Sequence, residues 1–268
     1  MIDTSRLSFL GSAGLTRLSE AEVVVIGAGG GGSHIVQQLS HLAVGTITVI
    51  DPDVLEPSNV NRVVGTTYAD VGQFKAALLA QRFDRLGARL IPLIESCTSI
   101  DGIAALQHAD LSFGAVDSFA TRNDIEAICR SSLTPYIDIG LNIELDDDGE
   151  VVSAGGQIAA SLPTGQCLRC MGIVTDERLA QDRLGYAIAA APDQQVVSMN
   201  GVLASEAVNI ALDLLTGYSR RRDASTYISY DALLHSLRPH PLFDASRTCD
   251  HFLIENAGWH VILPPRRV

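Results

Sequence analysis

The sequence predicts an α/β fold, a mostly parallel sheet with helices on both faces, continued by a region of antiparallel strands. Between Glu22 and Gly140, short apolar runs alternate with amphipathic stretches of helical period, which is typical of parallel strands joined by helices. Beyond Asn142 this alternation ends, and an Asp-Gly step within Asp146–Gly149 favours a tight turn between two strands. A hydrophobic content of 47% in 268 residues indicates a sizeable buried core.

The first half supplies the parallel sheet, because strands that alternate with helices imply a mostly parallel sheet covered on both faces. The strands are expected at Val23–Ile26, Ile47–Ile50, Leu90–Ile94, Leu111–Val116 and Tyr136–Ile139. The helices between them are expected near His34–His41, Phe74–Leu86, Ile103–Gln107 and Asn123–Cys129.

The second half is less regular. Residues 142–161 read as a hairpin, and residues 171–195 as an irregular crossover. Val196–Leu215 fits a long buried helix that ends at Gly217, a residue suited to a left-handed C-cap. The tail, Thr226–Val261, is expected to return as short strands.

Composition excludes several classes of function. A net charge of -12 argues against a nucleic-acid partner, because phosphate binding needs clustered Lys and Arg. No apolar run approaches the ~20 residues of a membrane span, and the N-terminus lacks the pattern of a signal peptide. The five cysteines include one Cys-x-x-Cys pair, which without an export signal indicates reduced thiols or a metal site. The cytoplasm is therefore the expected location.

A glycine loop marks a nucleotide site. Gly27, Gly29 and Gly32 satisfy G-x-G-x-x-G between a predicted strand and a predicted helix, where backbone N–H groups can approach phosphate oxygens closely. Asp51 ends the next strand, where a carboxylate can accept hydrogen bonds from ribose hydroxyls. These features predict a Rossmann-like nucleotide site, and taken alone they also fit an NAD-dependent oxidoreductase.

Further charged residues favour a triphosphate over a dinucleotide. Ser58-Asn59-Val60-Asn61-Arg62 and Gly72-Gln73-Phe74-Lys75 bring two cations, Arg62 and Lys75, which suit a triphosphate that loses pyrophosphate. Asp117 ends the fourth strand, where a carboxylate can hold Mg²⁺. Each residue also has a structural interpretation: Lys75 as a solvated surface charge and Asp117 as the N-cap of the next helix.

These motifs, in this order, resemble the E1-like (ubiquitin-activating) adenylyltransferases of the MoeB, ThiF and HesA group. The combination consists of the glycine loop, S-N-x-x-R, G-Q-x-K, D-x-x-x-x-R-N and a following C-x-x-C, and the resemblance runs from about Arg6 to Cys249. It implies adenylation, dependent on ATP and Mg²⁺, of the C-terminal carboxylate of a small ubiquitin-like protein with a C-terminal glycine tail. That partner would be a sulfur carrier or a modifier, and the products an acyl-adenylate and pyrophosphate. A relative that acts on a peptide or modifies tRNA is the alternative within the family.

The resemblance also implies roles for single residues. Asp51 would bind the ribose, Asn59, Arg62 and Lys75 the phosphates, and Asp117 the magnesium ion. Arg6 matches an N-terminal arginine that reaches ATP in the partner subunit of a homodimer. An E2-like or sulfurtransferase protein would act downstream. The chain is then a single E1-like adenylation domain, 1–268, with a nucleotide-binding half (1–141) and a partner-binding, crossover and zinc half (142–268).

The pair Cys167-x-x-Cys170 taken alone fits a redox pair, half of a zinc site or a chance spacing. The resemblance implies a structural Zn²⁺ site that Cys249 would join, with a lost site as the alternative. The family closes this site with four thiolates, but here Phe252 stands at the fourth position and cannot ligate. His251 would complete a Cys₃His set, with Asp250, His240 and His260 as other candidates. Cys97 and Cys129 have apolar neighbours and are expected to be small core residues.

Chemistry after adenylation depends on the crossover. Relatives that form a thioester carry a nucleophilic cysteine there, whereas the stretch from Met171 to Val197 contains no cysteine and includes Ala187, Ala189, Ala190 and Ala191. We expect the enzyme to stop at the acyl-adenylate, because alanine cannot replace an attacking thiolate. The alternative is that one of these alanines stands where the natural chain has a cysteine.

Overall fold

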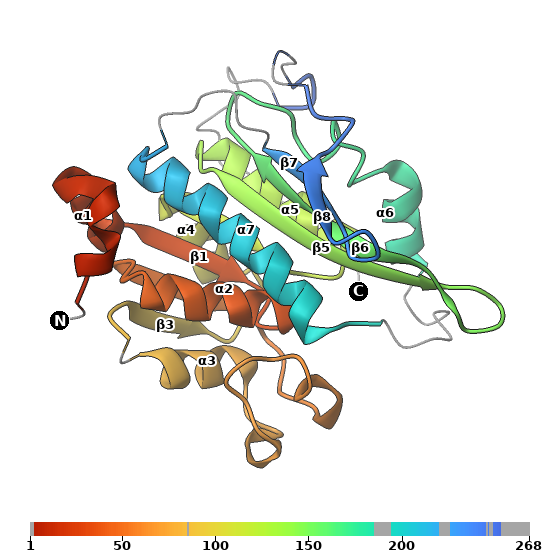
Figure 1. The fold of residues 1–268 in the computed structure, drawn as a ribbon, viewed down its shortest axis with the longest axis horizontal. Coiled ribbons are helices and arrows are strands. Elements are labelled where there is room, and N and C mark those ends of the chain that lie inside the picture. Colours follow the sequence, from red (N-terminus) through yellow and green to blue (C-terminus); the bar gives the residue numbers. More distant parts are fainter. Residues whose placement is uncertain are drawn as a thin grey trace.

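Eight strands form one sheet in this computed structural model, which describes residues 3–84, 86–184, 194–219, 226–244, 246 and 249–252. The strand order is β3-β2-β1-β4-β5-β6-β7-β8 (Figure 1). The first five strands pair in parallel and the last three are added antiparallel. The strands are β1 Glu22–Ile26, β2 Thr46–Ile50, β3 Arg89–Leu93, β4 Leu111–Gly114, β5 Tyr136–Leu145, β6 Val151–Ser161, β7 Tyr227–Asp231 and β8 Ser236–Pro239.

Helices cover both faces of the sheet, as predicted. Alternate residues of β1 enter two separate cores, Val23 and Val25 on one face and Val24 and Ile26 on the other. The first face packs against α1, α2, α3 and α7, and the second against α4 and α5 (Figure 1). The helices are η1 Ser5–Leu10, α1 Gly11–Glu20, α2 Gly30–His41, η2 Pro57–Asn59, η3 Tyr68–Asp70, α3 Lys75–Phe83, α4 Ile100–His108, α5 Phe119–Ser131, α6 Asp176–Arg183 and α7 Val197–Thr216.

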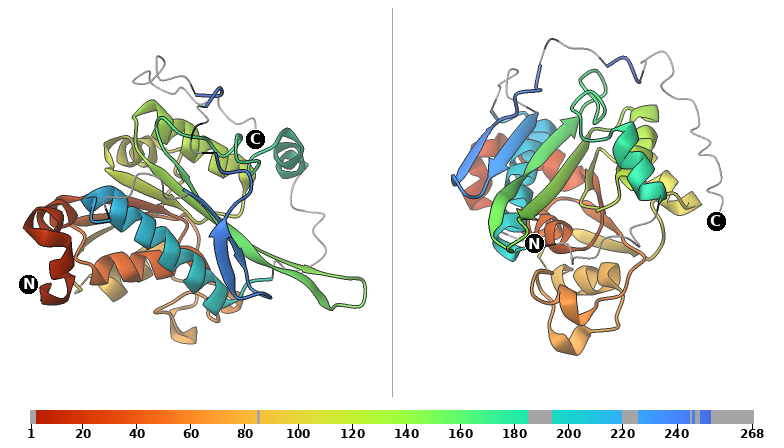
Figure 2. Two further views of the ribbon diagram at one scale, coloured as in Figure 1. Left: turned by 45° about the horizontal axis from the view of Figure 1, so that its top comes forward. Right: turned by 90° about the vertical axis from the view of Figure 1, so that its right-hand side faces the viewer.

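Strand β5 joins the parallel and antiparallel parts of the sheet. Its first residues, Tyr136 to Asp138, pair in parallel with β4, while the whole strand pairs antiparallel with β6. The predicted hairpin is therefore confirmed, but its first arm continues the fifth parallel strand without a break. The β5–β6 hairpin projects from the rest of the molecule (Figure 2). The expected boundary between residues 141 and 142 lies inside β5, so both halves share one sheet.

Several expectations for the second half need correction. The crossover is not irregular throughout, since α6 forms within it: the Thr175 side chain caps its N-terminus, and Asp176 and Glu177 lie in its first turn. Helix α7 matches the prediction within one residue and ends at Gly217, whose φ of 66° is left-handed. The tail supplies β7 and β8. Residues 187–191 and His260, which entered the predictions, lie outside the described residues.

Two elements near the N-terminus, η1 and α1, have no counterpart in the prediction. Arg17 of α1 donates to the main-chain oxygens of Leu215 and Thr216, so α1 supports the end of α7. In the part of the chain that the structure describes, no helix has the length and apolar character to cross a membrane.

Candidate functional site

A cleft of about 750 Å³ opens at the carboxyl ends of the parallel strands. After β1 the chain builds β2 and β3 on one side, and β4 then pairs with the other side of β1. Ligands of open α/β sheets bind at such a switch point. The cleft is lined by most of the residues that the sequence singles out: Gly27, Gly29, Asp51, Asn59, Arg62, Lys75 and Asp117.

The glycines of the loop are needed for different reasons. Gly27 has a left-handed φ of 88°, and a Cβ there would lie 2.4 Å from the main-chain oxygen of Ala115. A Cβ on Gly32 would lie 1.7 Å from the main-chain oxygen of Gly27. Gly32 is not among the described residues that line the cleft, because it packs beneath the loop. Gly29 does line the cleft, and a Cβ there would meet no atom within 4 Å, so its open side faces the space for a ligand.

Asp51 ties this loop to the end of β2. One carboxylate oxygen accepts a hydrogen bond from the Ala28 N–H (2.6 Å), and the other accepts from the Asp53 N–H (2.8 Å). Burial raises the pKa of Asp51, although these two N–H groups and the charge of Lys75 oppose the shift. Since each oxygen can accept more than one hydrogen bond, the carboxylate retains capacity for a ribose.

The two predicted cations enter the cleft from the segment after β2, Arg62 from a loop and Lys75 from the first position of α3. Lys75 lies 3.1 Å from the carboxylate of Asp53, and its side chain is only 13% exposed, so its interpretation as a solvated surface charge is wrong. Arg62 donates to the main-chain oxygen of Ser58 (2.7 Å). Asn59 is buried and accepts from the Glu56 N–H. These contacts fix the loop that presents the polar side chains.

Asp117 follows β4 and is exposed at the cleft. The N-cap of α5 is its neighbour Ser118, whose hydroxyl accepts from the Thr121 N–H. The interpretation of Asp117 as the N-cap is therefore wrong. Asp117 thus lines the cleft, and its role as a magnesium ligand stays a prediction.

The structure adds two arginines to the cleft, Arg122 and Arg178. Arg122 is buried, is paired with Asp138 and packs near the Phe119 ring; the Tyr136 hydroxyl donates to the same carboxylate. The spacing D-x-x-x-x-R places an arginine one turn into the helix after Asp117, so this signal was present in the motif. Arg178 comes from α6, and no sequence motif pointed to it.

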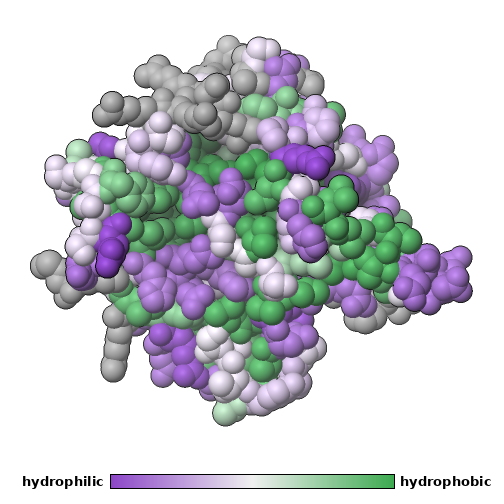
Figure 3. All heavy atoms as spheres, viewed as in Figure 1, coloured by the Kyte–Doolittle hydropathy of each residue, from purple (hydrophilic) through white to green (hydrophobic). Residues whose placement is uncertain are grey.

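A second hollow, of about 410 Å³, continues the cleft along one face of β5, β6 and β7. The two spaces share Asn142, Gln157, Tyr227 and His240, and we call the second one the sheet groove. The rings of Tyr227 and His240 stack 3.9 Å apart at their junction. Hydrophobic side chains gather along the neighbouring β5–β6 hairpin, whose tip is hydrophilic (Figure 3).

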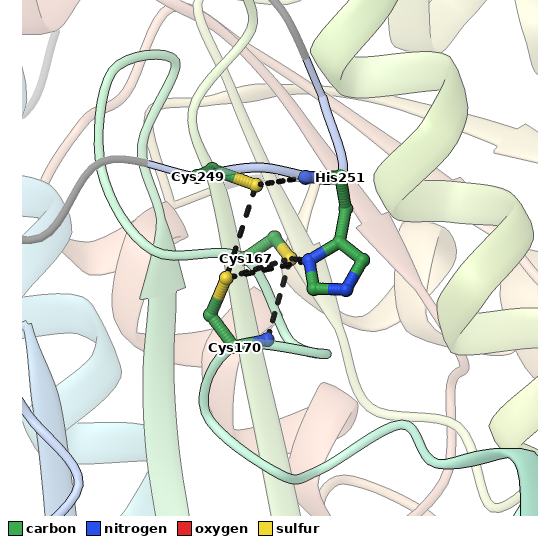
Figure 4. A group of neighbouring side chains, drawn as sticks. All are labelled: Cys167, Cys170, Cys249 and His251. Atoms are coloured by element: carbon green, nitrogen blue, oxygen red, sulfur yellow. Dashed lines mark hydrogen bonds between the residues drawn. The ribbon is translucent and has the colours of Figure 1, made fainter.

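Cys167, Cys170, Cys249 and His251 form a compact cluster (Figure 4), with all four ligand atoms within 4.8 Å of one another. The Sγ atoms lie 3.6 Å apart for Cys167 and Cys170, and 3.9 Å apart for Cys170 and Cys249. The Nδ1 atom of His251 lies 3.5 Å from Cys167 Sγ and 3.4 Å from Cys170 Sγ. Among the described residues, His240 and Asp250 are not members of this cluster.

These distances fit a tetrahedral zinc ion. Zn–S bonds of about 2.3 Å and Zn–N bonds of about 2.0 Å separate two sulfur ligands by about 3.8 Å, and sulfur from nitrogen by about 3.5 Å. Hydrogen bonds from α5 also hold the loop that carries Cys167 and Cys170. Glu126 accepts from the Leu168 N–H (2.8 Å), and Arg130 donates to the main-chain oxygens of Pro163, Gly165 and Gln166.

Arg6 and the remaining cysteines lie apart from these groups. Arg6 is exposed in η1 and is not among the described residues that line the cleft, so its role in a partner subunit stays a prediction. Cys97 and Cys129 are buried, as expected. Burial raises the pKa of Cys129 to about 12, which keeps this thiol protonated and unreactive.

Comparisons with known proteins agree with this arrangement. A profile described as the ThiF family matches residues 3–251. The SAMP-activating enzyme E1 of Haloferax volcanii is 30% identical over 164 residues, which cover 60% of this chain and 57% of that protein. The sulfur carrier protein ThiS adenylyltransferase of Escherichia coli is 29% identical over 162 residues, covering 59% and 61%. The chain thus spans about three fifths of the length of these relatives.

A more distant relative matches over more of the chain. The molybdopterin-synthase adenylyltransferase of Escherichia coli is 24% identical over 229 residues, which cover 84% of each protein. Among solved structures, Escherichia coli MccB with succinimide superposes with a TM-score of 0.71 at 19% identity, covering 91% of this chain and 73% of that one. This structural likeness shows a shared fold.

Proposed function

The chain belongs to the ThiF family, and on this premise we propose that it adenylates the C-terminal carboxylate of a small ubiquitin-like protein with ATP. The observation that carries the proposal is the continuity of two spaces: a nucleotide cleft that contains Asp51, Arg62, Lys75 and Asp117, and a sheet groove that opens into it. An NAD-dependent oxidoreductase would leave both cations and Asp117 without a role. Relatives named adenylyltransferases favour the same assignment.

The nucleotide would bind across the carboxyl ends of β1, β2 and β4. Its phosphates would approach the open side of Gly29 at the N-terminus of α2, and its ribose would meet Asp51. Lys75 would exchange the carboxylate of Asp53 for a phosphate oxygen. That exchange is easy, because Asp53 is 65% exposed and an ion pair with so exposed a partner contributes about 0–1 kcal/mol.

Asp117 would hold magnesium, which when bound neutralises part of the phosphate charge. The protein's own cations would act in the reaction. An oxygen of the partner's carboxylate attacks the α-phosphorus, the bond to the β-phosphate oxygen breaks, and pyrophosphate leaves with the bonding electrons. Arg62 and Lys75 stabilise the negative charge that develops on the phosphates. This step needs no nucleophile from the protein, in keeping with the burial of Cys97 and Cys129.

The sheet groove suits an extended peptide that ends in small residues. It runs along β6 and β7 and reaches the cleft past the Tyr227–His240 stack, so a tail lying in it would point its carboxylate at the nucleotide. At Gly155 the floor carries no side chain, so a tail of small residues can lie close to the sheet there. We infer that the partner is a sulfur carrier or modifier with a glycine tail, in line with the Escherichia coli relative, which is named an adenylyltransferase of the sulfur carrier protein ThiS.

Exchange of labelled pyrophosphate into ATP tests this proposal. Exchange should require a ubiquitin-like protein with a free C-terminal carboxylate and should not occur when that carboxylate is amidated. Asp117→Ala should lower the rate at least ~10²-fold, the scale for loss of one charge-stabilising group. Asp147→Ala, which removes an exposed carboxylate from the hairpin turn, serves as the control. A wild-type rate in Asp117→Ala would refute the assignment.

The same assay separates the alternatives within the family. A synthetic peptide equal to the partner's tail should support exchange poorly if the folded partner is the substrate, and fully if the enzyme activates peptides. If the enzyme modifies tRNA, neither the partner protein nor the peptide should support exchange, and tRNA should be the substrate.

Arg6 allows a test of the homodimer. If Arg6 completes the cleft of a second subunit, Arg6→Ala and Asp117→Ala should each lack exchange. A mixture of the two variants should regain part of it, because one cleft of each mixed dimer has both residues intact. No recovery on mixing would contradict the action of Arg6 across the dimer.

A further inference from the structure

Helix α6 of the crossover docks onto the loop that carries Asp117. One carboxylate oxygen of Asp182, near the end of α6, accepts from the hydroxyl of Ser118 (3.0 Å) and from the N–H of Ala120 (2.7 Å). These residues follow Asp117 directly in the chain but lie more than sixty positions from Asp182. A carboxylate from a distant element thus holds the backbone at the edge of the cleft.

Asp182 fits this place because the first turn of α5 lacks intrahelical partners for its N–H groups. Ser118 satisfies the Thr121 N–H, and Asp182 satisfies the Ala120 N–H. A negative charge at a helix N-terminus is also favourable. The hydroxyl of Ser118 links both caps, since it accepts from Thr121 while it donates to Asp182.

A second contact connects α6 to the same loop and to the metal cluster. The guanidinium of Arg178 lies 5.0 Å from the centre of the Phe119 ring. Arg178 also donates to the main-chain oxygens of Gly172 (3.1 Å) and Ile173 (2.8 Å), just after Cys170. Helix α6 therefore bridges the segment after the cysteine pair and the loop after β4.

We propose that Asp182 is a positioning residue for adenylation, which holds the Ser118–Ala120 backbone so that the Asp117 carboxylate stays directed into the cleft. The part of this inference that concerns magnesium rests on the proposed function. Asp117 and Ser118 share a peptide bond, so displacement of Ser118 displaces the carboxylate as well. Displacements of about 1 Å at a reacting site can cost 10²-fold in rate.

The first test measures the contact itself. In Asp182→Ala, hydrogen–deuterium exchange of a peptide that contains Ala120 should become faster, because its N–H loses its acceptor. Asp182→Asn should stay close to wild type, since its side-chain oxygen can still accept both hydrogen bonds. Gln181→Ala is the matched control, because Gln181 is an exposed neighbour on the same helix. Unchanged protection in Asp182→Ala would overturn the proposal.

The second test measures the consequence. Asp182→Ala should raise the Mg²⁺ concentration that gives half-maximal ATP–pyrophosphate exchange by about tenfold or more, an effect comparable to the loss of a hydrogen bond to a charged group. Asp182→Asn should recover most of this shift, whereas Glu177→Gln, which removes a charge from the same helix, should show none. A general loss of folding would lower the rate without changing the Mg²⁺ dependence, and that result would also overturn the proposal.

The two tests separate this inference from the proposed function. If wild-type protein gives no exchange with any carboxylate-terminated partner, the proposed function fails, and the deuterium measurement still decides whether Asp182 holds the loop. If the wild type is active and Asp182→Ala has the same Mg²⁺ dependence, only the positioning role fails.

Discussion

Alanine substitutions at two glycines of the nucleotide loop should affect different properties: Gly32→Ala should lower stability, whereas Gly29→Ala should lower ATP affinity. In Gly32→Ala the new Cβ would lie 1.7 Å from the main-chain oxygen of Gly27, far closer than atoms can approach. Overpacking of this kind costs up to about 3 kcal/mol, and the better helix propensity of alanine returns about 1 kcal/mol. The net loss of about 2 kcal/mol corresponds to a fall in Tm of about 4–8 °C in a chain of this size.

Gly29→Ala should leave folding almost intact and weaken nucleotide binding. Its Cβ would meet no atom within 4 Å, and its φ of -80° is ordinary for alanine. The unfolding free energy should therefore change by less than about 1 kcal/mol. Because the methyl group would occupy the space where phosphates approach the backbone, ATP affinity should fall about 10–100-fold, the equivalent of one hydrogen bond to a charged group.

Thermal unfolding and calorimetric titration with ATP, performed on both variants, test this pair together. The expected result is a lower Tm for Gly32→Ala, and a wild-type Tm with weak ATP binding for Gly29→Ala. A wild-type Tm in Gly32→Ala would show that the loop is not packed as described. Wild-type ATP affinity in Gly29→Ala would place the phosphates elsewhere.

Three further predictions concern the rest of the molecule. Burial raises the pKa of Glu126 from 4.5 to about 7, so the folded state binds this proton more tightly than the unfolded chain, and stability is lost as pH rises from 4.5 through 7. That loss amounts to about 3 kcal/mol; Glu126→Gln should therefore melt higher than wild type at pH 8 but not at pH 4, and parallel pH profiles would contradict this. Purified protein should contain one Zn²⁺ per chain by metal analysis, and His251→Ala should weaken zinc binding by more than about tenfold, since even residues behind metal ligands contribute about 10–100-fold; zinc-free wild type would refute the site. With ATP, Mg²⁺ and its partner, the chain should release pyrophosphate but show no dithiothreitol-sensitive adduct on a non-reducing gel, and such a band would reveal a reactive cysteine.

The parallel strands could be predicted because strands that are buried on both faces consist mostly of apolar residues. Val23–Ile26 is an unbroken apolar run, Ile47–Ile50 is interrupted only by Thr48, and the structure has strands at both. The glycine loop and Asp51 were equally accessible, since a tight turn at a strand end restricts residue type over a short span. The continuous β5 was harder to predict, because its outer half is exposed and its composition changes near Asn142.

Helix α6 was missed for a physical reason. None of its residues is fully buried, and only Leu179 packs against the core, so its sequence carries no clear hydrophobic period. Thr175 and the acidic residues after it were the only local signals of a helix. The contacts of Arg178 and Asp182 with the Asp117 loop were also inaccessible, because they join segments far apart in sequence and involve common surface residue types. The metal cluster was partly predictable: spacing marked Cys167 and Cys170, and the resemblance added Cys249 with His251 as one of several candidates. Only the fold shows that His251, and not His240 or Asp250, lies beside the cysteines.

The continuity of β5 and β6 sets a minimum reach for whatever enters the sheet groove. Along β6 the groove extends from Val152 to Gln157, five residue steps, or about 17 Å at the rise of an antiparallel strand. A bound tail must cross that distance on its own backbone, because the strands beneath it are hydrogen-bonded to their neighbours and cannot shorten. Roughly five extended residues are therefore needed between a folded partner and its terminal carboxylate. The length of the free tail would therefore select among partners, whatever side chains the tail carries.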